Sequence, residues 1–234
     1  MRLCVIPARG GSKRIPGKNI KEFYGFPIIA YSIKAAISSQ YFDKIIVSTD
    51  DQEIAEVAKL YGAEVPFIRP DELANDYATI LPVVKHAIEW FEKRGQSPKD
   101  VCCLFATAPF VSPDDIKKAY KQLKKTQTDY CFTVTSAGFP IQRAFKLTQE
   151  RRIKMLYPEF FESRSQDLEG VYHDAGQFYW GKSEAFKQLI PVFSEVATSY
   201  ILPRYLVHDI DTEEDWARAE IMFRVAQEIK ILEK

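Results

Sequence analysis

The sequence has few residues able to form disulfides or metal-thiolate sites. Its four cysteines lie in apolar segments, and no two of them form a Cys-x-x-Cys pair: Cys4, Cys102, Cys103 and Cys131. The three histidines show no ligand spacing with these thiols, which argues against a zinc site. We therefore expect buried, reduced cysteines and a cytoplasmic protein.

The chain also lacks a net charge and a long hydrophobic run. Its 32 Lys and Arg residues balance 32 Asp and Glu residues, and the pI is about 6.8. This balance gives no general attraction to nucleic acids or to anionic membranes, so neither is an expected partner. No apolar run approaches the roughly 18 residues that a membrane span needs. The first run is cut by Pro7 and Arg9, so we expect no signal segment there.

Short apolar runs alternate with amphipathic segments along most of the 234 residues. The runs predict buried strands at residues 3–6, 44–48, 64–68, 101–106, 130–135, 177–180 and about 200–202. The amphipathic segments predict helices at residues 27–38, 52–61, 80–93 and 113–125, and from residues 183 and 213 onward. Such alternation is typical of an α/β fold in which helices cover both faces of a largely parallel sheet.

The alternation breaks between residues 139 and 174. This stretch contains two prolines, clustered arginines and several aromatic residues. We interpret it as an insertion within a single domain of residues 1–234. Aromatic residues on an irregular excursion are typical of a subunit contact, and a long surface loop explains the pattern equally well.

A glycine-rich basic loop, residues 7–19, follows the first predicted strand. Its cations are Arg9, Lys13, Arg14 and Lys18. Ligands bind at the carboxyl ends of the strands in parallel sheets, and three glycines allow close approach of the backbone. Exposed amides together with these cations predict a cradle for a triphosphate, with a solvated basic loop as the alternative. The segment is not a Walker A loop, because Asn19 stands in place of the Ser or Thr.

Two acidic residues near the end of the sequence, Asp209 and Asp211, follow the last predicted strand. Residues i and i+2 of an extended segment point the same way, so we expect their carboxylates to converge. Converging carboxylates suit Mg²⁺, which would offset charge during phosphoryl or nucleotidyl transfer. The alternative is that Asp211 or Thr212 only caps the last helix; Thr212 and Asp215 do predict a capping box.

Several longer blocks accompany these two motifs and cover nearly the whole chain. They are residues 48–51 (STDD), 66–70 (PFIRP), 106–110 (ATAPF), 140–143 (PIQR) and 172–181 (YHDAGQFYWG). With the basic loop, they resemble the nonulosonate cytidylyltransferases, which join CMP to sialic-acid-like sugars. The blocks are most similar to those of the members that use pseudaminic acid.

The resemblance implies a Rossmann-like nucleotidyltransferase fold and a homodimer. It implies that the insertion at residues 139–174 helps dimerisation and reaches the partner's site. It assigns CTP to Ala8, Arg9, Gly10, Ser12, Lys18, Asn19, Arg69 and Thr79. It also implies that Asp209 and Asp211 hold Mg²⁺ and that they form the catalytic set together with Arg9 and Lys18.

Candidate contacts to the sugar are less specific: Arg143, Arg164, His173, Gln177 and Tyr179. The arginines suit the sugar carboxylate, although a solvated arginine is the more common case. Tyr179 as a core residue, and His173 with Asp174 as a structural pair, are equally good interpretations. Sialic acid enzymes usually carry Gln-Pro-Thr-Ser-Pro at residues 105–109, where this chain has Phe-Ala-Thr-Ala-Pro, which argues against N-acetylneuraminate.

The expected reaction is transfer of CMP from CTP to the anomeric hydroxyl of a nonulosonic acid, with release of pyrophosphate. Pseudaminate is the expected sugar, with legionaminate and N-acetylneuraminate as alternatives. A glycosyltransferase that uses Asp-x-Asp is an alternative of another class, although such enzymes usually place the pair mid-chain and lack the basic loop. A non-catalytic nucleotide-binding module is a further alternative, but it has no need of both aspartates.

Overall fold

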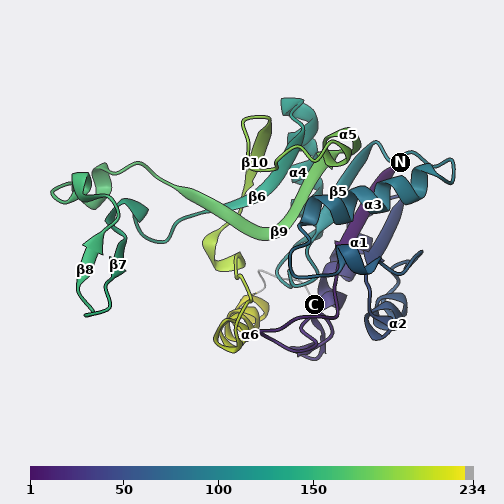
Figure 1. Cartoon of the computed structure of the whole chain (residues 1–234), viewed down its shortest axis with the longest axis horizontal. Helices are drawn as coiled ribbons and strands as arrows, with labels where there is room; N and C mark the ends of the chain where they lie inside the picture. Colours follow the sequence, from purple (N-terminus) through teal and green to yellow (C-terminus); the bar gives the residue numbers. More distant parts are fainter. Residues whose placement is uncertain (230–234) are drawn as a thin grey trace.

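This computed structural model describes residues 1–229, and its central sheet has six strands. Figure 1 shows how the helices and the arm of residues 137–171 are arranged around that sheet. The strands are β1 (Arg2–Pro7), β4 (Lys44–Ser48), β5 (Asp100–Leu104), β6 (Tyr130–Ser136), β9 (Tyr172–Lys182) and β10 (Ala197–Ile201). Their order is β10-β6-β9-β5-β1-β4. Neighbouring strands pair in parallel except β9, which runs antiparallel to both β5 and β6. The predicted α/β fold with a largely parallel sheet is confirmed.

Helix boundaries follow the capping signals of the sequence. The α-helices of the described residues are α1 (Ile28–Ser39), α2 (Gln52–Leu60), α3 (Ile80–Glu92), α4 (Pro113–Thr126), α5 (Ser183–Lys187) and α6 (Glu213–Glu228). Asp51 caps α2 and Ser112 caps α4, each accepting a hydrogen bond from a backbone amide of the first turn. Thr212 and Asp215 form the predicted capping box of α6.

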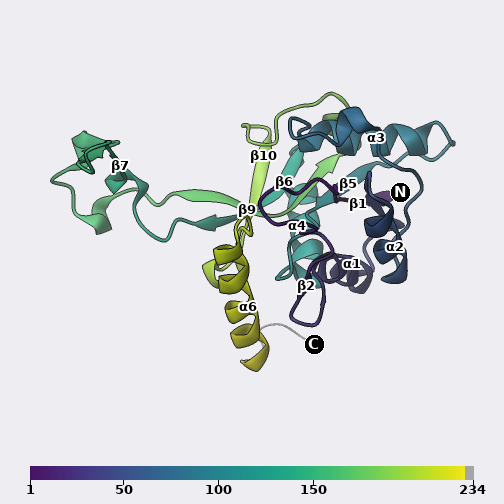
Figure 2. The same ribbon diagram turned by 60° about the horizontal axis from the view of Figure 1, so that its bottom comes forward.

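Helices cover both faces of the sheet (Figure 2), and the side chains of the strands point alternately into the two cores between them. Cys4 and Ile6 of β1 pack with apolar residues of α1, α2 and α4 on one face. Leu3 and Val5 of the same strand pack with α3 and α5 on the other face. The four cysteines are free and buried within this core, as predicted. Burial raises the pKa of each thiol.

Helix α6 packs on the N-terminal loop instead of the sheet (Figures 1 and 2). The loop ends in a small hairpin of β2 (Glu22–Phe23) and β3 (Phe26–Pro27). The ring of Phe23 lies 5.5 Å from that of Trp216 and 5.3 Å from that of Phe223, each in an edge-to-face contact. Ile15 from the basic loop and Ile210 from the late acidic segment are buried in the same cluster. This packing brings the two ends of the chain together.

Residues 137–171 leave the body as an arm between β6 and β9 (Figure 1). The arm carries an antiparallel hairpin of β7 (Phe145–Leu147) and β8 (Ile153–Met155). It also has short 3-10 turns, η2 (Ile141–Arg143), η3 (Pro158–Phe160) and η4 (Ser165–Asp167). Tyr172 pairs with Ser136 in the sheet, so the arm occupies most of the stretch of about residues 139–174 that we interpreted as an insertion. Pairing with β6 thus holds the base of the arm.

One predicted strand is wrong. Residues 64–68 form only two isolated bridges, from Ile46 to Glu64 and from Thr49 to Ile68. Pro66 lies between these bridges and has no amide hydrogen to donate to a ladder, which explains the interruption. Two further 3-10 turns, η1 (Asp71–Leu73) and η5 (Arg204–Leu206), complete the described elements. Within residues 1–229 no helix combines the length and the apolar character required to cross a membrane.

The α6 cluster gives a stability prediction. Phe223 is 3% exposed and contacts the rings of Phe23, Tyr31 and Phe110. We expect Phe223→Ala to lower the free energy of unfolding by about 3–5 kcal/mol, since it leaves a cavity among these rings. Urea denaturation measures the change. Ile221→Ala on the exposed side of the same helix is the control and should change it by less than about 0.5 kcal/mol. Equal effects of the two variants would show that α6 is not anchored through Phe223.

Candidate active site

A cavity of about 450 Å³ opens beside the basic loop, where β1 and β4 end. Its lining consists of Pro7, Arg9, Ser12, Lys13, Arg14, Lys18, Asn19, Arg69, Asp76, Ala78, Ile80 and Val83. Five residues with a predicted role toward CTP are in this set: Arg9, Ser12, Lys18, Asn19 and Arg69. Thr79, at the N-cap of α3, lies between two lining residues but is not itself one of them.

The first turn of the loop is shaped by hydrogen bonds to the end of β4. The amide of Ala8 donates to the carbonyl of Ser48 at 3.0 Å, and the amide of Gly10 donates to Oδ1 of Asp50 at 3.1 Å. A Cβ atom on Gly10 would lie 2.6 Å from Oδ2 of Asp51, so only glycine fits this approach. The sequence led us to expect exposed amides in this loop, but the amides of Ala8 and Gly10 donate hydrogen bonds within the protein. The charge of the cradle comes mainly from side chains.

Arg69 places a cation at the wall of the cavity with little contact to water. It is 4% exposed, and its guanidinium donates to the hydroxyl and carbonyl of Ser48 and to the carbonyl of Leu73. Burial lowers its pKa to about 10, so it stays charged at neutral pH. Among the described residues it has only these neutral acceptors and no carboxylate partner. The charge of Asp50 favours the cationic form from a distance, and a buried cation without a direct ion pair favours a bound anion.

The basic loop and the late acidic segment meet at Lys18. Its Nζ donates to the carbonyl of Ile210 at 2.6 Å and lies 3.3 Å from Oδ1 of Asp211. Arg14 reaches the other oxygen of that carboxylate, with Nη2 and Oδ2 2.9 Å apart. The two motifs predicted from the sequence therefore share one site, although they lie about 190 residues apart in the chain.

Asp209 is the unpaired member of the acidic pair. It makes no hydrogen bond or ion pair with any described residue, and it is exposed. Partial desolvation of its carboxyl raises the pKa, and the charge of Asp211 raises it further against the smaller opposing effect of Lys18. A nearby divalent cation would relieve this repulsion. Residues 1–229 contain no cluster of three His, Cys, Asp or Glu residues that could hold a metal ion, so a cation bound by these two carboxylates would need further oxygen ligands from a substrate or from water.

Asp76 lines the cavity without having been identified from the sequence. Its Oδ1 lies 2.6 Å from Nη1 of Arg9, and its Oδ2 forms an ion pair with Lys13. The only sequence signal was its place in the polar turn before Thr79. A lone acid in a turn does not identify a partner 67 residues away, which explains why it was missed.

Comparisons with known proteins agree with this geometry. A family model described as cytidylyltransferase matches residues 3–158. This chain belongs to the cytidylyltransferase family. The predicted enzyme class is thereby confirmed, and family membership decides against the two alternatives of other classes.

Two curated relatives align with nearly the whole cytidylyltransferase chain. A pseudaminic acid cytidylyltransferase of Campylobacter jejuni is 46% identical over 226 residues, which are 97% of each protein. A CMP-N,N'-diacetyllegionaminic acid synthase of Legionella pneumophila is 33% identical, again over 97% of each. Among solved structures, a CMP:2-keto-3-deoxy-manno-octonic acid synthetase complexed with CTP has a TM-score of 0.71 at 15% identity. It covers 97% of this chain and 99% of its own, and it confirms the predicted nucleotidyltransferase fold.

Three sugar candidates of the cytidylyltransferase lie on β9, outside the cavity lining. His173 is exposed, and its Nδ1 is 2.8 Å from the carbonyl of Asp174. Gln177 is buried and donates from Nε2 to the carbonyl of Leu206 at 2.7 Å, while its Oε1 has no partner among the described residues. Tyr179 is 7% exposed and donates to the carboxylate of Asp174; its pKa is raised, chiefly by burial. Tyr179 is thus part of the core, one of its two sequence interpretations.

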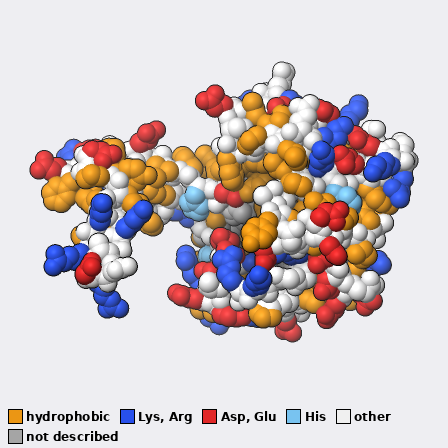
Figure 3. All heavy atoms as spheres, viewed as in Figure 1, with side chains coloured by type: hydrophobic (Ala, Val, Ile, Leu, Met, Phe, Trp, Pro, Cys, Tyr) orange, Lys and Arg blue, Asp and Glu red, His pale blue; other side chains and the backbone are white. Residues whose placement is uncertain are grey.

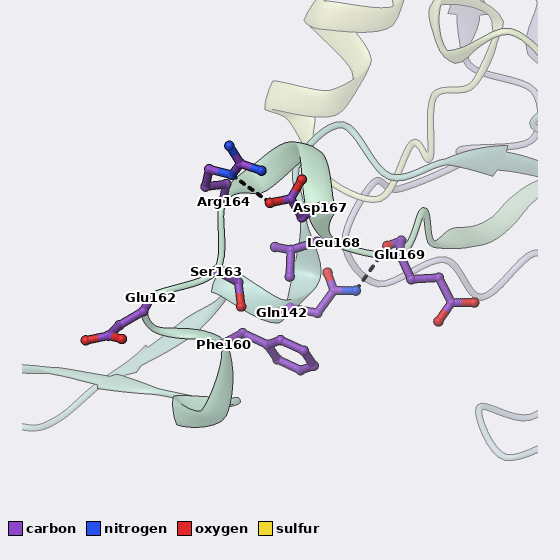
Figure 4. Close-up of a pocket in the computed structure, with 8 residues that line it drawn as sticks. All are labelled: Gln142, Phe160, Glu162, Ser163, Arg164, Asp167, Leu168 and Glu169. Carbon is purple, nitrogen blue, oxygen red and sulfur yellow. Dashed lines mark hydrogen bonds and ion pairs between the residues drawn. The ribbon is translucent and has the colours of Figure 1, made fainter.

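The remaining candidates, Arg143 and Arg164, lie on the arm of the cytidylyltransferase. Arg143 donates to the carbonyl of Ser163, and Nε of Arg164 lies 2.7 Å from Oδ2 of Asp167. Arg164 borders a hollow of about 620 Å³ within the arm, together with Gln142, Phe160, Glu162, Ser163, Asp167, Leu168 and Glu169 (Figure 4). Within one chain, neither arginine joins the residues of the cavity beside the basic loop.

Asp209 has no ion-pair partner among the described residues, whereas Asp211 pairs with two cations, so replacing each by Asn should change the stability in opposite directions. The folded pKa of Asp209 is raised, so its ionisation disfavours the folded state above that pKa, and Asp209→Asn should raise the melting temperature at pH 7. Asp211→Asn removes the ion-pair partner of Lys18 and Arg14 and should lower the free energy of unfolding by about 1 kcal/mol. The melting temperature should then fall by about 2–4 °C. Thermal denaturation without metal or nucleotide measures both. The gain from Asp209→Asn should shrink as the pH falls toward 4. A fall in melting temperature for both variants would contradict this assignment.

Proposed function

We propose that this cytidylyltransferase transfers CMP from CTP to the anomeric hydroxyl of pseudaminic acid and releases pyrophosphate. The observation that carries the choice of sugar is the 46% identity to the Campylobacter jejuni pseudaminic acid enzyme, against 33% for the legionaminic acid enzyme. The geometry that supports the chemistry is the meeting of Lys18 and Asp211 at the edge of a cation-lined cavity. Legionaminate and N-acetylneuraminate are the alternative sugars.

In the proposed reaction, the side chains of the basic loop bind the triphosphate. Arg9, Lys18 and Arg69 neutralise its oxygens, while Ser12 and Asn19 offer hydrogen bonds, and Ala8, Gly10 and Thr79 shape the surrounding backbone. The anomeric hydroxyl attacks the α-phosphorus in line with the departing pyrophosphate. Positioning and charge neutralisation supply most of the rate enhancement in such a transfer.

Mg²⁺ is the proposed cofactor, held by Asp209 and Asp211. Bound there, it would supply charge neutralisation at the phosphate oxygens. The carboxylate of Asp209 supports this assignment because it has no ion-pair partner among the described residues; desolvation, and after it the charge of Asp211, raises its pKa. Lys18 bridges this acidic pair and the cavity, so it is the residue that aligns the two halves of the site.

The sugar would lie beside the first half of β9, within reach of His173 and Gln177, while the core residue Tyr179 would hold the nearby carboxylate of Asp174 in place. The buried Oε1 of Gln177, which lacks a partner among the described residues, supports a polar ligand nearby. Arg143 and Arg164 are proposed to bind the sugar carboxylate from the arm of a partner subunit, since they do not join the cavity of their own chain.

The arm is the proposed dimerisation element of a single cytidylyltransferase domain. In the β7–β8 hairpin, Leu147 pairs with Ile153 and Phe145 pairs with Met155, so all four side chains share one face. Phe145, Leu147 and Ile153 are 54%, 66% and 66% exposed. Hydrophobic side chains also gather on the part of the arm nearest the body and above the hairpin, while Lys and Arg side chains dominate the visible side of its lower part (Figure 3). A second copy of the chain would cover this apolar face.

We further propose a cytoplasmic location. The supporting observation is that the four cysteines are free, as expected in a reducing compartment.

Pyrophosphate release with a panel of sugars tests the proposed reaction. With CTP and Mg²⁺, turnover should be fastest with pseudaminate and slower with legionaminate, N-acetylneuraminate and 3-deoxy-manno-octulosonate. Lys18→Ala should lower the rate at least about 100-fold, because it removes an electrostatic stabiliser. Lys117→Ala, which removes a partly exposed lysine of α4, is the control and should retain full activity. If turnover were fastest with another sugar, the assignment of pseudaminate would be wrong and that sugar would be the substrate.

Light scattering tests the proposed dimer. The triple substitution of Phe145, Leu147 and Ile153 by Ser should convert the dimer to a monomer, because it removes the apolar face of the hairpin. Lys146→Ser with Lys154→Ser changes the opposite face of the same hairpin and should leave the dimer intact. A wild-type chain that is monomeric at micromolar concentration would refute this role of the arm.

A further inference from the structure

Asp76 holds two cations of the basic loop at once. One carboxylate oxygen pairs with Arg9 and the other pairs with Lys13. Hydrogen bonds from these two side chains lower the pKa of Asp76, Lys13 contributing most, so the carboxylate is charged at neutral pH. A carboxylate that presents two oxygens to two cations occupies them much as two oxygens of a phosphate would.

The turn that carries Asp76 is stabilised by its own hydrogen bonds. Oδ1 of Asn75 accepts from the amides of Tyr77 and Ala78 at 2.9 and 3.0 Å, and its Nδ2 donates to the carbonyl of Glu72 at 2.9 Å. No backbone hydrogen bond between this turn and the basic loop occurs in the described part of the chain. The side chain of Asp76 can therefore leave Arg9 and Lys13 without disrupting any backbone pairing.

The carboxylate also lines the same cavity as the cations proposed to bind CTP. Arg9, Lys13 and Asp76 have side chains that are 35%, 79% and 37% exposed, so an incoming anion can reach them. Partly exposed ion pairs are weak individually, and a polyanion with several phosphate oxygens forms more charge-assisted contacts than one carboxylate. Asp76 is therefore displaceable by a nucleotide, and it weakens the binding of every anion that depends on these two cations.

We propose that Asp76 is an intramolecular competitor for the triphosphate site, occupying Arg9 and Lys13 until a nucleotide displaces it. This inference rests on the proposed CTP site. In the free enzyme, the carboxylate excludes small anions such as inorganic phosphate, which make few other contacts. After transfer, its return to the same cations favours the departure of pyrophosphate. Asp76 thus tunes the affinity of the site and takes no part in bond making or breaking.

Calorimetric titration of Asp76→Asn with CTP and with pyrophosphate tests this role. Both dissociation constants should fall by about 5–10-fold, which corresponds to the removal of two weak, partly exposed ion pairs. Asp76→Glu keeps the charge and should bind like the wild type. Asp129→Asn removes a comparable pair with Lys182 and should leave both constants unchanged. The effect of Asp76→Asn should diminish at high salt, since screening weakens the competing pairs.

Other outcomes overturn the inference. Weaker binding of both ligands by Asp76→Asn would mean that Asp76 orients Arg9 and Lys13 for the nucleotide. Weaker binding only when Mg²⁺ is present would make it a metal ligand. Unchanged constants, with an unchanged melting temperature, would make the ion pairs a surface feature without function. If the wild-type chain binds neither CTP nor pyrophosphate, the proposed function fails instead.

Discussion

The contact between Lys18 and the segment that ends at Asp211 is the interaction on which the site depends. It joins a loop at the start of the chain to a segment near its end through one carbonyl and one carboxylate. These polar contacts are partly exposed and weak by themselves. The buried aromatic cluster between α6 and the N-terminal loop keeps the two segments together. Hydrophobic packing thus fixes the position, and the charged groups supply the chemistry.

The charges in this site are incompletely matched in the free protein. Arg69 is buried and donates only to neutral acceptors, and Asp209 is partly desolvated beside Asp211 without an ion-pair partner among the described residues. Unsatisfied charge of both signs at one site suits a ligand that itself carries both, such as a polyphosphate with a divalent metal ion. Asp76 relieves part of this imbalance by pairing with Arg9 and Lys13. The free enzyme therefore stabilises its cationic loop with a group that a nucleotide replaces.

The antiparallel strand β9 connects the parts of the molecule. It lies between β5 and β6 inside the sheet, carries three of the proposed sugar contacts, and is the strand through which the arm returns to the body. Through the hydrogen bond from Gln177 to Leu206, it also holds the turn that precedes the acidic pair.

Local signals in the sequence determined the capped helices, the buried strands of the sheet and the two motifs, because caps and apolar periodicity act over a few residues. The family blocks then identified the enzyme class. Other features depended on tertiary contacts: the failed strand at residues 64–68, the antiparallel direction of β9, and the engagement of Gly10 with Asp50. The pairing of Asp76 with Arg9 depended on them as well. Strand direction and ion pairing between distant residues are set by which segments meet after folding, and no local pattern encodes that meeting.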